Sequence, residues 1–498
     1  MAESFSWLVV VALFLGLLGL LVVQLSKGGI VQHKERGSST YASSIEQARL
    51  RSAVILGHFA NLASDDKQKA ANPKGVRDNS LIIYSGESHL LTVGSTRSGK
   101  GVGAIIPNLL QYAGSVLVID PKGENVAKTA HIRKQMGHNV IVLDPWKLSP
   151  WQSCTYNPFD EFTTTSETLV EDARLLAESL VVSSLDLSQH FFEEEAKSVL
   201  STIIAFLLTS GEGPSLTSLI EILGQKDSEV VEFFDKLTQN QELDGFISRG
   251  ATRFVDKAPN ELSGVLSTAR QHIEFLDATA MKRVLSSSSL RLSILRERPT
   301  TIYLVIPVWR LQRYNRWLRL MLTMALTELS EVKPEQTISV LVIIDEFASL
   351  GLLPSFETAF ALMAGLGVQL WPIIQDFTQL KRLYGENWET FVANAGVLQF
   401  FGTRDLLTAS YISGRMGPST IIIQERSTAY SDTTEHERLE QRPLKYPDEI
   451  IKLDANFGIT FVENSQPIIF KKIKYFEEAI FSESAIKAAI EKNEQKTG

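Results

Sequence analysis

The chain has 498 residues, of which 44% are hydrophobic and 21% are charged, so it is long enough for two or three globular domains with sizeable cores. The formal net charge of −8 neither favours nor excludes binding to nucleic acid, because basic residues can gather locally in a channel. The single cysteine, Cys154, excludes a disulfide framework and a cysteine-based zinc site, which fits a reducing cytosol.

The N-terminal segment differs in composition from the rest of the chain. Residues Trp7–Leu25 include no charged side chain and are dominated by Leu and Val. At about 1.5 Å per residue, a helix over them would span roughly the hydrocarbon core of a bilayer. Glu3 precedes this span, whereas Lys27 and Arg36 follow it. The positive-inside rule therefore predicts that residues 1–26 form one transmembrane anchor, with the bulk of the chain in the cytoplasm. The alternative, a cleaved signal peptide, lacks a basic start and a small-residue cleavage site.

A polar juxtamembrane segment, residues 27–80, follows the anchor. The apolar residues around 44–63 recur with a helical pattern, so we expect a helix there. The α/β core is expected to begin near residue 81.

A glycine-rich loop follows the buried strand expected at 90–93. In this strand–loop–helix context it fits the phosphate-binding pattern G-x-x-x-x-G-K, whose backbone N–H groups surround an anion. The cofactor-binding residues expected for ATP are Gly94, Ser95, Thr96, Arg97, Ser98, Gly99, Lys100, Gly101 and Val102. Lys100 would bind the β- and γ-phosphates. Gly101 departs from the pattern, because a magnesium-binding Ser or Thr normally follows the lysine. A purely structural turn is the alternative, but it has little need for glycines that cost about 1 kcal/mol each in a first helical turn.

Residues 339–346, Ser-Val-Leu-Val-Ile-Ile-Asp-Glu, form a continuously apolar run that ends in two carboxylates. Such a run is typical of a central parallel strand buried on both faces. Ligands bind at the carboxyl ends of strands in open α/β sheets. We therefore expect Asp345 to hold Mg²⁺ and Glu346 to polarise the attacking water as general base. The alternative is a solvated strand end, where Asp and Glu are ordinary.

Three further apolar runs, at 115–120, 301–307 and 368–375, also have polar residues at or after their carboxyl ends. Gln375 is a candidate for orienting water or sensing the γ-phosphate, although a lone Gln is more often a solvated strand end. Asp120, Lys122 and Glu124, which end or follow the first of these runs, could belong to the site or could equally form a salt-linked turn. Apolar strands that alternate with helical stretches predict a parallel α/β core.

A long insertion separates the glycine loop from the two carboxylates, by roughly 240 residues, which is too many for one compact nucleotide core. Residues 161–295 lack strong strand runs and show helical patterns instead. We therefore expect an all-α domain there, inserted into a nucleotide-binding domain made of 81–160 and 296–480. Residues 481–498 form a polar tail.

The glycine loop, continued through Ile106-Pro-Asn-Leu-Leu110, resembles that of type IV secretion coupling proteins, the TraG/TraD conjugative DNA transfer family. Other segments match the family in order, and the resemblance covers roughly residues 55 to 475. These segments are Asp120–Glu124, Tyr156–Phe159, Tyr303–Pro307, Asp345–Gly351, Gln375, Tyr384-Gly385, Asn394-Ala395, Phe401–Asp405 and Arg442–Glu449. A set of ordered motifs is much more specific than any one of them.

The resemblance implies a RecA-like P-loop core with an inserted all-α domain, assembled as a homohexamer at the inner membrane. It implies hydrolysis of ATP with Mg²⁺, coupled to pumping of single-stranded DNA, as a relaxase–DNA complex, or of protein effectors into the type IV secretion channel. Gly101 is familiar from one branch of the family, so it supports the specific match. Two features depart from many members: we expect one membrane helix where they have two, and the tail is not acidic.

Ring ATPases usually place an arginine of the next subunit against the γ-phosphate, and Arg404 and Arg415 are the candidates. A structural salt bridge is an equal alternative for each. Arginines at 310, 313, 316 and 319 form a stripe that either lines a DNA pore or is a solvated helix face.

Two other classes of function compete with a coupling ATPase. One is a membrane-anchored DNA translocase of the FtsK/HerA type without a secretion role, which normally also has a winged-helix module or a nuclease partner. The other is a non-hydrolysing membrane adaptor with a degenerate phosphate-binding loop, an alternative that Gly101 suggests because it replaces the usual Ser or Thr. Intact Lys100, Asp345, Glu346 and Gln375 favour an enzyme over the adaptor.

Overall fold

The structure is a computed structural model, and the residues that it describes are 53–60, 81–162, 166–182, 187–211, 213–331, 338–429 and 432–486. The expected membrane span, Trp7–Leu25, lies outside them. Among the described residues, no helix combines the length and the apolar composition that crossing a membrane requires.

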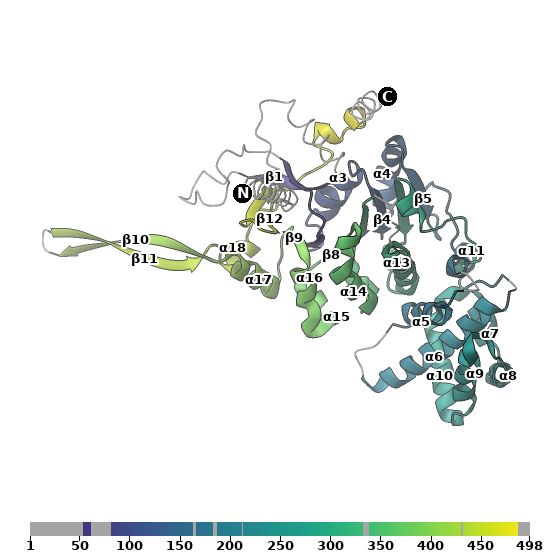
Figure 1. The fold of residues 1–498 in the computed structure, drawn as a ribbon. Helices are drawn as coiled ribbons and strands as arrows, with labels where there is room; N and C mark the ends of the chain where they lie inside the picture. The colour runs from purple at the N-terminus through teal and green to yellow at the C-terminus, as the bar shows by residue number, and fades with distance from the viewer. Residues whose placement is uncertain are drawn as a thin grey trace, which may run out of the picture.

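A sheet of 11 strands within the described residues organises the molecule (Figure 1). Its parallel part has the strand order β9-β3-β8-β7-β4-β6-β5. The bounds are β3 (His89–Val93), β4 (Ser115–Asp120), β5 (Asn139–Leu143), β6 (Thr300–Val305), β7 (Val340–Ile344), β8 (Val368–Ile374) and β9 (Ala395–Phe400). Nearly all of their residues are buried. These are the continuous apolar runs expected of parallel strands that are covered on both faces, so the predicted α/β core is confirmed.

Four antiparallel strands extend the sheet beyond β9, in the order β12-β13-β1-β2. Their bounds are β1 (Val54–Phe59), β2 (Leu81–Tyr84), β12 (Phe457–Val462) and β13 (Ile468–Lys471). The predicted helix around 44–63 is therefore wrong at 54–59, which is a buried strand. A short apolar run has the same appearance in a buried strand and a buried helix, and pairing with β2 and β13 decides in favour of the strand.

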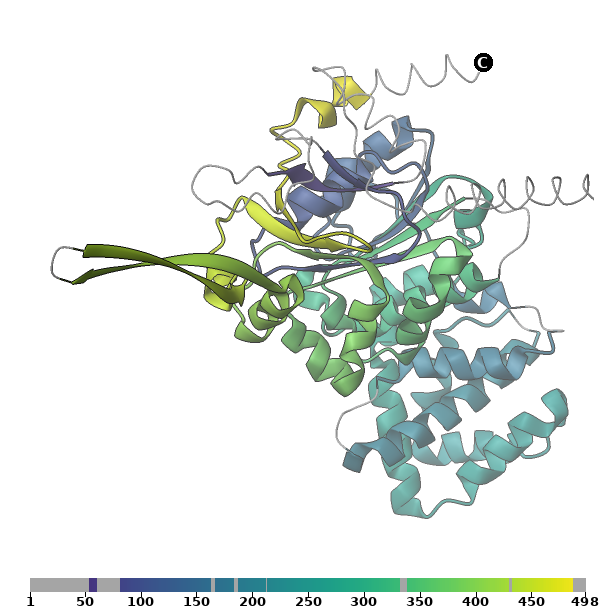
Figure 2. The same ribbon diagram turned by 60° about the vertical axis from the view of Figure 1, so that its left-hand side comes forward.

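Helices cover both faces of the sheet (Figures 1 and 2). On one face lie α3 (Ile106–Leu109) and α4 (Glu124–Gln135), packed on alternate strand residues such as Leu90 and Val118. The strand residues that alternate with these, such as Leu91, belong to the hydrophobic core on the opposite face of the sheet. The helices of that second face are α13 (Asn315–Ser330), α14 (Pro354–Leu362), α15 (Phe377–Tyr384), α16 (Glu389–Ala393) and α17 (Leu406–Met416). This alternation with period two keeps each strand buried on both sides.

A helical lobe lies between β5 and β6 in sequence and below the sheet in Figure 2. Its helices are α5 (Leu169–Leu180), α6 (Leu187–Thr209), α7 (Ser218–Leu223), α8 (Asp227–Leu237), α9 (Glu242–Val255), α10 (Pro259–Ile273), α11 (Thr279–Leu285) and α12 (Ile294–Glu297). They occupy the stretch for which the sequence predicts an all-α domain. Their apolar side chains share one hydrophobic core with α13 and with one face of the sheet.

A two-stranded ribbon projects from the body in both views (Figures 1 and 2). Its strands are β10 (Pro418–Ala429) and β11 (Asp432–Pro443), and their backbones pair from end to end. It joins the body next to α17 and α18 (Pro447–Ile451).

The four arginines at 310, 313, 316 and 319 do not share one helix face, so the alternative of a solvated helix face is wrong, and the lining of a DNA pore stays a prediction. The helix α13 begins only at Asn315, and the first two arginines precede it. Their contacts differ: Arg310 lies 5.8 Å from the ring centre of Trp146, Arg313 pairs with Glu274, Arg316 contacts His272, and Arg319 is buried. Although the four arginines are evenly spaced in the sequence, each therefore has a different environment in the folded protein.

Arg319 ties α13 to two other parts of the structure. Its guanidinium donates to the backbone carbonyls of Ser179 at 3.3 Å, Leu350 at 3.1 Å and Leu352 at 2.5 Å. Ser179 belongs to α5 in the helical lobe, whereas the other two follow the Asp345-Glu346 pair. The arginine therefore fixes the segment after these carboxylates against the helical lobe.

Replacing Arg319 with Met should lower the midpoint of thermal unfolding and destabilise the protein by at least about 2 kcal/mol, because buried carbonyls would lose their donors. Arg313→Met is the matched control, since its pair with Glu274 is exposed. Such pairs contribute about 0–1 kcal/mol. Equal losses of stability in the two variants would contradict the assigned role of Arg319.

Candidate functional site

Four neighbouring strands end side by side at the carboxyl edge of the sheet, in the order β3-β8-β7-β4. The register places Val93 beside Ile374 and Ile344 beside Ile119. The residues that follow these positions are the glycine loop, Gln375, Asp345 and Asp120. The polar strand ends therefore meet at one edge although they are far apart in sequence.

The glycine loop turns tightly over the end of β3. The N–H of Gly94 donates to the Ile374 carbonyl at 3.0 Å, and that of Ser95 donates to the Gly402 carbonyl at 3.2 Å. A Cβ at Gly94 would lie 2.7 Å from Ser98 Oγ and 2.8 Å from Phe401 Cβ. A larger residue would therefore push the loop away from the sheet, and only glycine allows this approach.

The loop presents backbone donors to a ligand. Within the described chain, no group accepts a hydrogen bond from the N–H groups of Arg97, Gly99 or Lys100. A Cβ added at Gly99 or Gly101 would meet no atom within 4 Å. Unpaired N–H groups beside open space, at the start of a helix, are what a phosphate requires. The loop residues thus fit the phosphates of ATP.

Lys100 lies at the centre of the site and is almost fully buried. Its Nζ donates to the carbonyl of Gly94 at 2.6 Å and to that of Ile374 at 3.5 Å. Burial lowers the pKa of Lys100, while the negative charges of Glu346 and Asp345 act to raise it. The positive charge of Lys100 therefore interacts with the negative charges of both carboxylates.

Asp345 and Glu346 follow β7 and enter the same site. Burial, together with the adjacent charge of Glu346, raises the pKa of Asp345 to about 6, whereas Lys100 and Lys122 act to lower it. Glu346 has a left-handed backbone with φ 58°, a conformation that costs a non-glycine residue of order 1–3 kcal/mol. Strain of this kind concentrates at functional sites, where the surroundings hold it in place.

Gln375 is not a free strand end, because its Nε2 donates to Glu346 Oε2 at 3.0 Å. Its own N–H donates to Gln379 Oε1 at 3.0 Å, which fixes the start of the segment. The amide that follows β8 and the carboxylate that follows β7 thus meet directly. This contact fixes the two side chains relative to each other.

The residues also fit Mg²⁺. Burial raises the pKa of Asp120 to about 6, and this carboxylate ends the strand beside β7. Asp120 Oδ2 accepts a hydrogen bond from Val126 N at 2.9 Å, and no salt-linked turn with Lys122 or Glu124 forms among the described residues. In the part of the chain that the structure describes, no group of three or more potential ligands could hold a metal alone. Mg²⁺ suits such a site, because one or two carboxylates and the phosphates complete its coordination.

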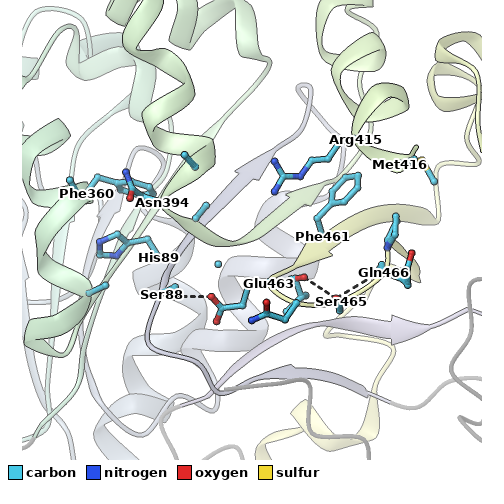
Figure 3. A pocket seen from close by; sticks show the side chains of 18 residues that line it. Ser88, His89, Phe360, Asn394, Arg415, Met416, Phe461, Glu463, Ser465 and Gln466 are labelled. Carbon is cyan, nitrogen blue, oxygen red and sulfur yellow. Dashed lines mark hydrogen bonds between the residues drawn. The ribbon is translucent and has the colours of Figure 1, made fainter. Parts of the chain in front are cut away.

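The two candidate arginines lie in different places. Arg404 is exposed in the loop after β9, two residues beyond the Gly402 carbonyl that Ser95 contacts. Arg415 belongs to α17 and lies 5.4 Å from the ring centre of Phe461. It lines a cavity of about 620 Å³ together with His89 (Figure 3). Because His89 begins β3, that cavity lies at the opposite edge of the sheet from this chain's glycine loop.

Sequence reasoning missed two lysines at the site. Lys122 is exposed in the turn after β4, and its charge acts on Asp345 and Lys100. The run Asp120-Pro-Lys-Gly-Glu124 at a strand end was an available signal for it. Lys472 donates to the Ser98 carbonyl of the glycine loop at 3.1 Å. No sequence signal pointed to Lys472, because it reaches the loop from the far end of the chain.

Solved structures of similar fold include those of a bacterial conjugative coupling protein. TrwBdeltaN70 in its unbound form superposes with a TM-score of 0.59 at 17% identity and covers 84% of this chain and 93% of its own. TrwB in complex with the non-hydrolysable ATP analogue ADPNP gives 0.58 at 17% identity over 84% of this chain and 94% of its own. TrwB with ADP and Mg²⁺ gives 0.57 at 17% identity over 85% and 95%. This likeness shows that the fold is shared.

Sequence comparisons agree with that likeness. A conjugal transfer protein TraG of Escherichia coli is 27% identical over 445 residues, which cover 81% of this chain and 70% of that protein. Protein VirD4 of Agrobacterium fabrum is 26% identical over 462 residues, 90% of this chain and 66% of that protein. A family model described as type IV secretory system conjugative DNA transfer matches residues 50–498. Since this match spans most of the chain, the protein belongs to the type IV secretory system conjugative DNA transfer family.

Proposed function

We propose that this protein is the coupling ATPase of a type IV secretion or conjugation system. It hydrolyses ATP with Mg²⁺ to move single-stranded DNA, carried as a relaxase–DNA complex, or protein effectors into the secretion channel. The observation that carries the proposal is the meeting of the glycine loop, Lys100, Asp345 and the Glu346–Gln375 contact at one edge of the sheet. Family membership and the nucleotide complexes of TrwB support it.

The loop binds the nucleotide through its backbone. The N–H groups of Gly99 and Lys100 lie at the start of a helix and are free to donate to phosphate oxygens. On binding, the ammonium of Lys100 leaves the Gly94 carbonyl and pairs with the β- and γ-phosphates. This exchange is favourable because a hydrogen bond to a charged phosphate is stronger than one to a neutral carbonyl. Burial of this lysine excludes water from the pair and strengthens the attraction.

Glu346 is the general base, and Gln375 positions it. The Gln375 amide donates to one carboxylate oxygen of Glu346, which leaves the other oxygen for the attacking water. Glu346 follows β7 with a left-handed backbone, φ 58° and ψ 44°. Asp345 and the phosphates would hold Mg²⁺, which would supply positive charge to the phosphate oxygens. Gly101 supplies no hydroxyl after Lys100, and the carboxylates at this edge of the sheet are Asp345 and Asp120.

Assembly and location complete the proposal. The site lies at an open edge of one subunit, and Arg404 is exposed in a loop beside it. In a homohexamer, Arg404 of one subunit acts on the γ-phosphate held by its neighbour. Trp7–Leu25 anchors the ring in the bacterial inner membrane, with the nucleotide site on the cytoplasmic side.

Lys100→Ala should raise the dissociation constant of Mg·ADP at least about 100-fold, because the loop loses the buried ammonium that pairs with the phosphates. Binding is measured by titration calorimetry on the purified chain. Lys128→Ala, which removes an exposed lysine of α4, is the control and should bind as the wild type does. Equal affinity in Lys100→Ala and wild type would contradict the assigned phosphate site.

Glu346→Gln should keep nucleotide affinity and lose about 10²–10⁴-fold in turnover, as expected for removal of a general base. Gln375→Ala should lose less. The double variant should be no slower than Glu346→Gln alone, because Gln375 acts through Glu346 and groups that act as a unit are not additive. Steady-state release of phosphate measures all three. Additive losses would show that Gln375 acts independently of Glu346.

Arg404→Ala should bind nucleotide normally and lose about 10³-fold in turnover, the scale of an arginine finger. Mixing Arg404→Ala with Lys100→Ala subunits tests action in trans. Each mixed ring contains interfaces that pair an intact loop with an intact arginine, so the mixture should recover hydrolysis that neither variant has alone. A mixture that assembles and stays inactive would contradict the assignment of Arg404 to the neighbouring site.

A further inference from the structure

Lys472 forms a hydrogen bond with the backbone of the glycine loop, although it lies near the other end of the chain. It directly follows β13, and its Nζ donates to three backbone carbonyls. The acceptors are Ser98 at 3.1 Å, Phe401 at 2.6 Å and Ala455 at 2.8 Å. An ammonium has three protons, so this contact set uses its whole donor capacity.

The three carbonyls belong to three different segments. Ser98 is part of the glycine loop, Phe401 opens the loop that carries Arg404, and Ala455 precedes β12. The backbone of Lys472 is itself fixed, since its N–H donates to the Asn456 carbonyl at 2.7 Å. The ammonium therefore connects the glycine loop to the loop that carries Arg404 by hydrogen bonds.

Asp454 is the carboxylate that acts on the charge of Lys472, and the two form no ion pair among the described residues. The remaining partner of the ammonium is the ring of Phe401, whose centre is 5.4 Å from Nζ. Burial lowers the pKa of Lys472 to about 8, while Asp454 acts to raise it. Partial burial of the ammonium is unfavourable for folding, and its three hydrogen bonds to carbonyls offset that cost.

Peptide geometry connects this contact to the nucleotide. The described chain has no cis peptide bond, so the Ser98 carbonyl and the following Gly99 N–H point in opposite directions. Lys472 holds the Ser98 carbonyl by a hydrogen bond. The same contact therefore fixes the orientation of the Gly99 N–H, which has no acceptor among the described residues.

We propose that Lys472 is a positioning residue for the nucleotide. It presets the Ser98–Gly99 peptide so that the Gly99 N–H faces the phosphates, and it links this peptide to the loop of Arg404. The inference rests on the proposed binding of ATP at residues 94–102. Its ligand class is a nucleoside di- or triphosphate, and Lys472 acts on it through the loop without touching it.

Lys472→Met tests the proposal, because Met fills the same space without a donor or a charge. We expect its dissociation constant for Mg·ADP to rise at least about tenfold, as for the loss of one oriented phosphate contact. Lys472→Arg keeps the charge and the donors and should stay within about threefold of wild type. Lys471→Met removes the exposed neighbouring lysine and should bind as wild type does.

Thermal midpoints are measured on the same samples, with and without Mg·ADP. A merely structural lysine would lower the midpoint in Lys472→Met and leave the affinity of the folded protein unchanged, which would overturn the inference. Equal weakening in Lys472→Arg and Lys472→Met would also overturn it. If Lys472→Met does not fold, Lys472→Gln, whose shorter side chain has two amide N–H donors and no charge, should show weakening in the same direction. Absence of Mg·ADP binding by the wild type would overturn the proposed function itself.

Discussion

The alignment of four parallel strand ends is the constraint on which the site depends. The strands β3, β8, β7 and β4 are neighbours in the sheet although the chain visits them in a different order. Each contributes one part: the glycine loop, Gln375, the Asp345-Glu346 pair and Asp120. Because a parallel sheet forces all carboxyl ends to one edge, correct strand order alone brings these groups together. Arg319 then holds the segment after β7 against the helical lobe, so the lobe and the site are mechanically connected.

Opposite charges at this edge determine what it binds. Burial raises the pKa of Asp120 and of Asp345 to about 6, since two carboxyl groups close together in a poorly solvated place resist ionisation. Lys100 counteracts this from the loop, and Lys122 counteracts it from the turn after β4. A divalent cation and a phosphate chain satisfy both sets of charges at once. Lys472 adds a third cation behind the loop, where it orients backbone groups.

The sequence predicted the parts of this site that are local. Glycines 94 and 99, Lys100 and the apolar run ending in Asp345 each carry a short-range signal, and the parallel core was confirmed around them. Features that depend on long-range pairing were not predictable. Val54–Phe59 was assigned to a helix because only pairing with β2 and β13 distinguishes it, and the regular arginine spacing at 310–319 gave no hint of four different tertiary partners. Lys472 and the glycine loop are at opposite ends of the chain, so only the fold reveals their contact.

The steady-state rate of ATP hydrolysis by the purified wild-type protein tests the central claim most directly. It is measured with Mg²⁺, in the presence and absence of single-stranded DNA, on protein whose assembly state is determined in parallel. The account predicts Mg²⁺-dependent turnover that single-stranded DNA stimulates, since the proposed site combines a phosphate-binding loop with Glu346 as general base. Nucleotide binding without turnover, in protein that has assembled into rings, would contradict it.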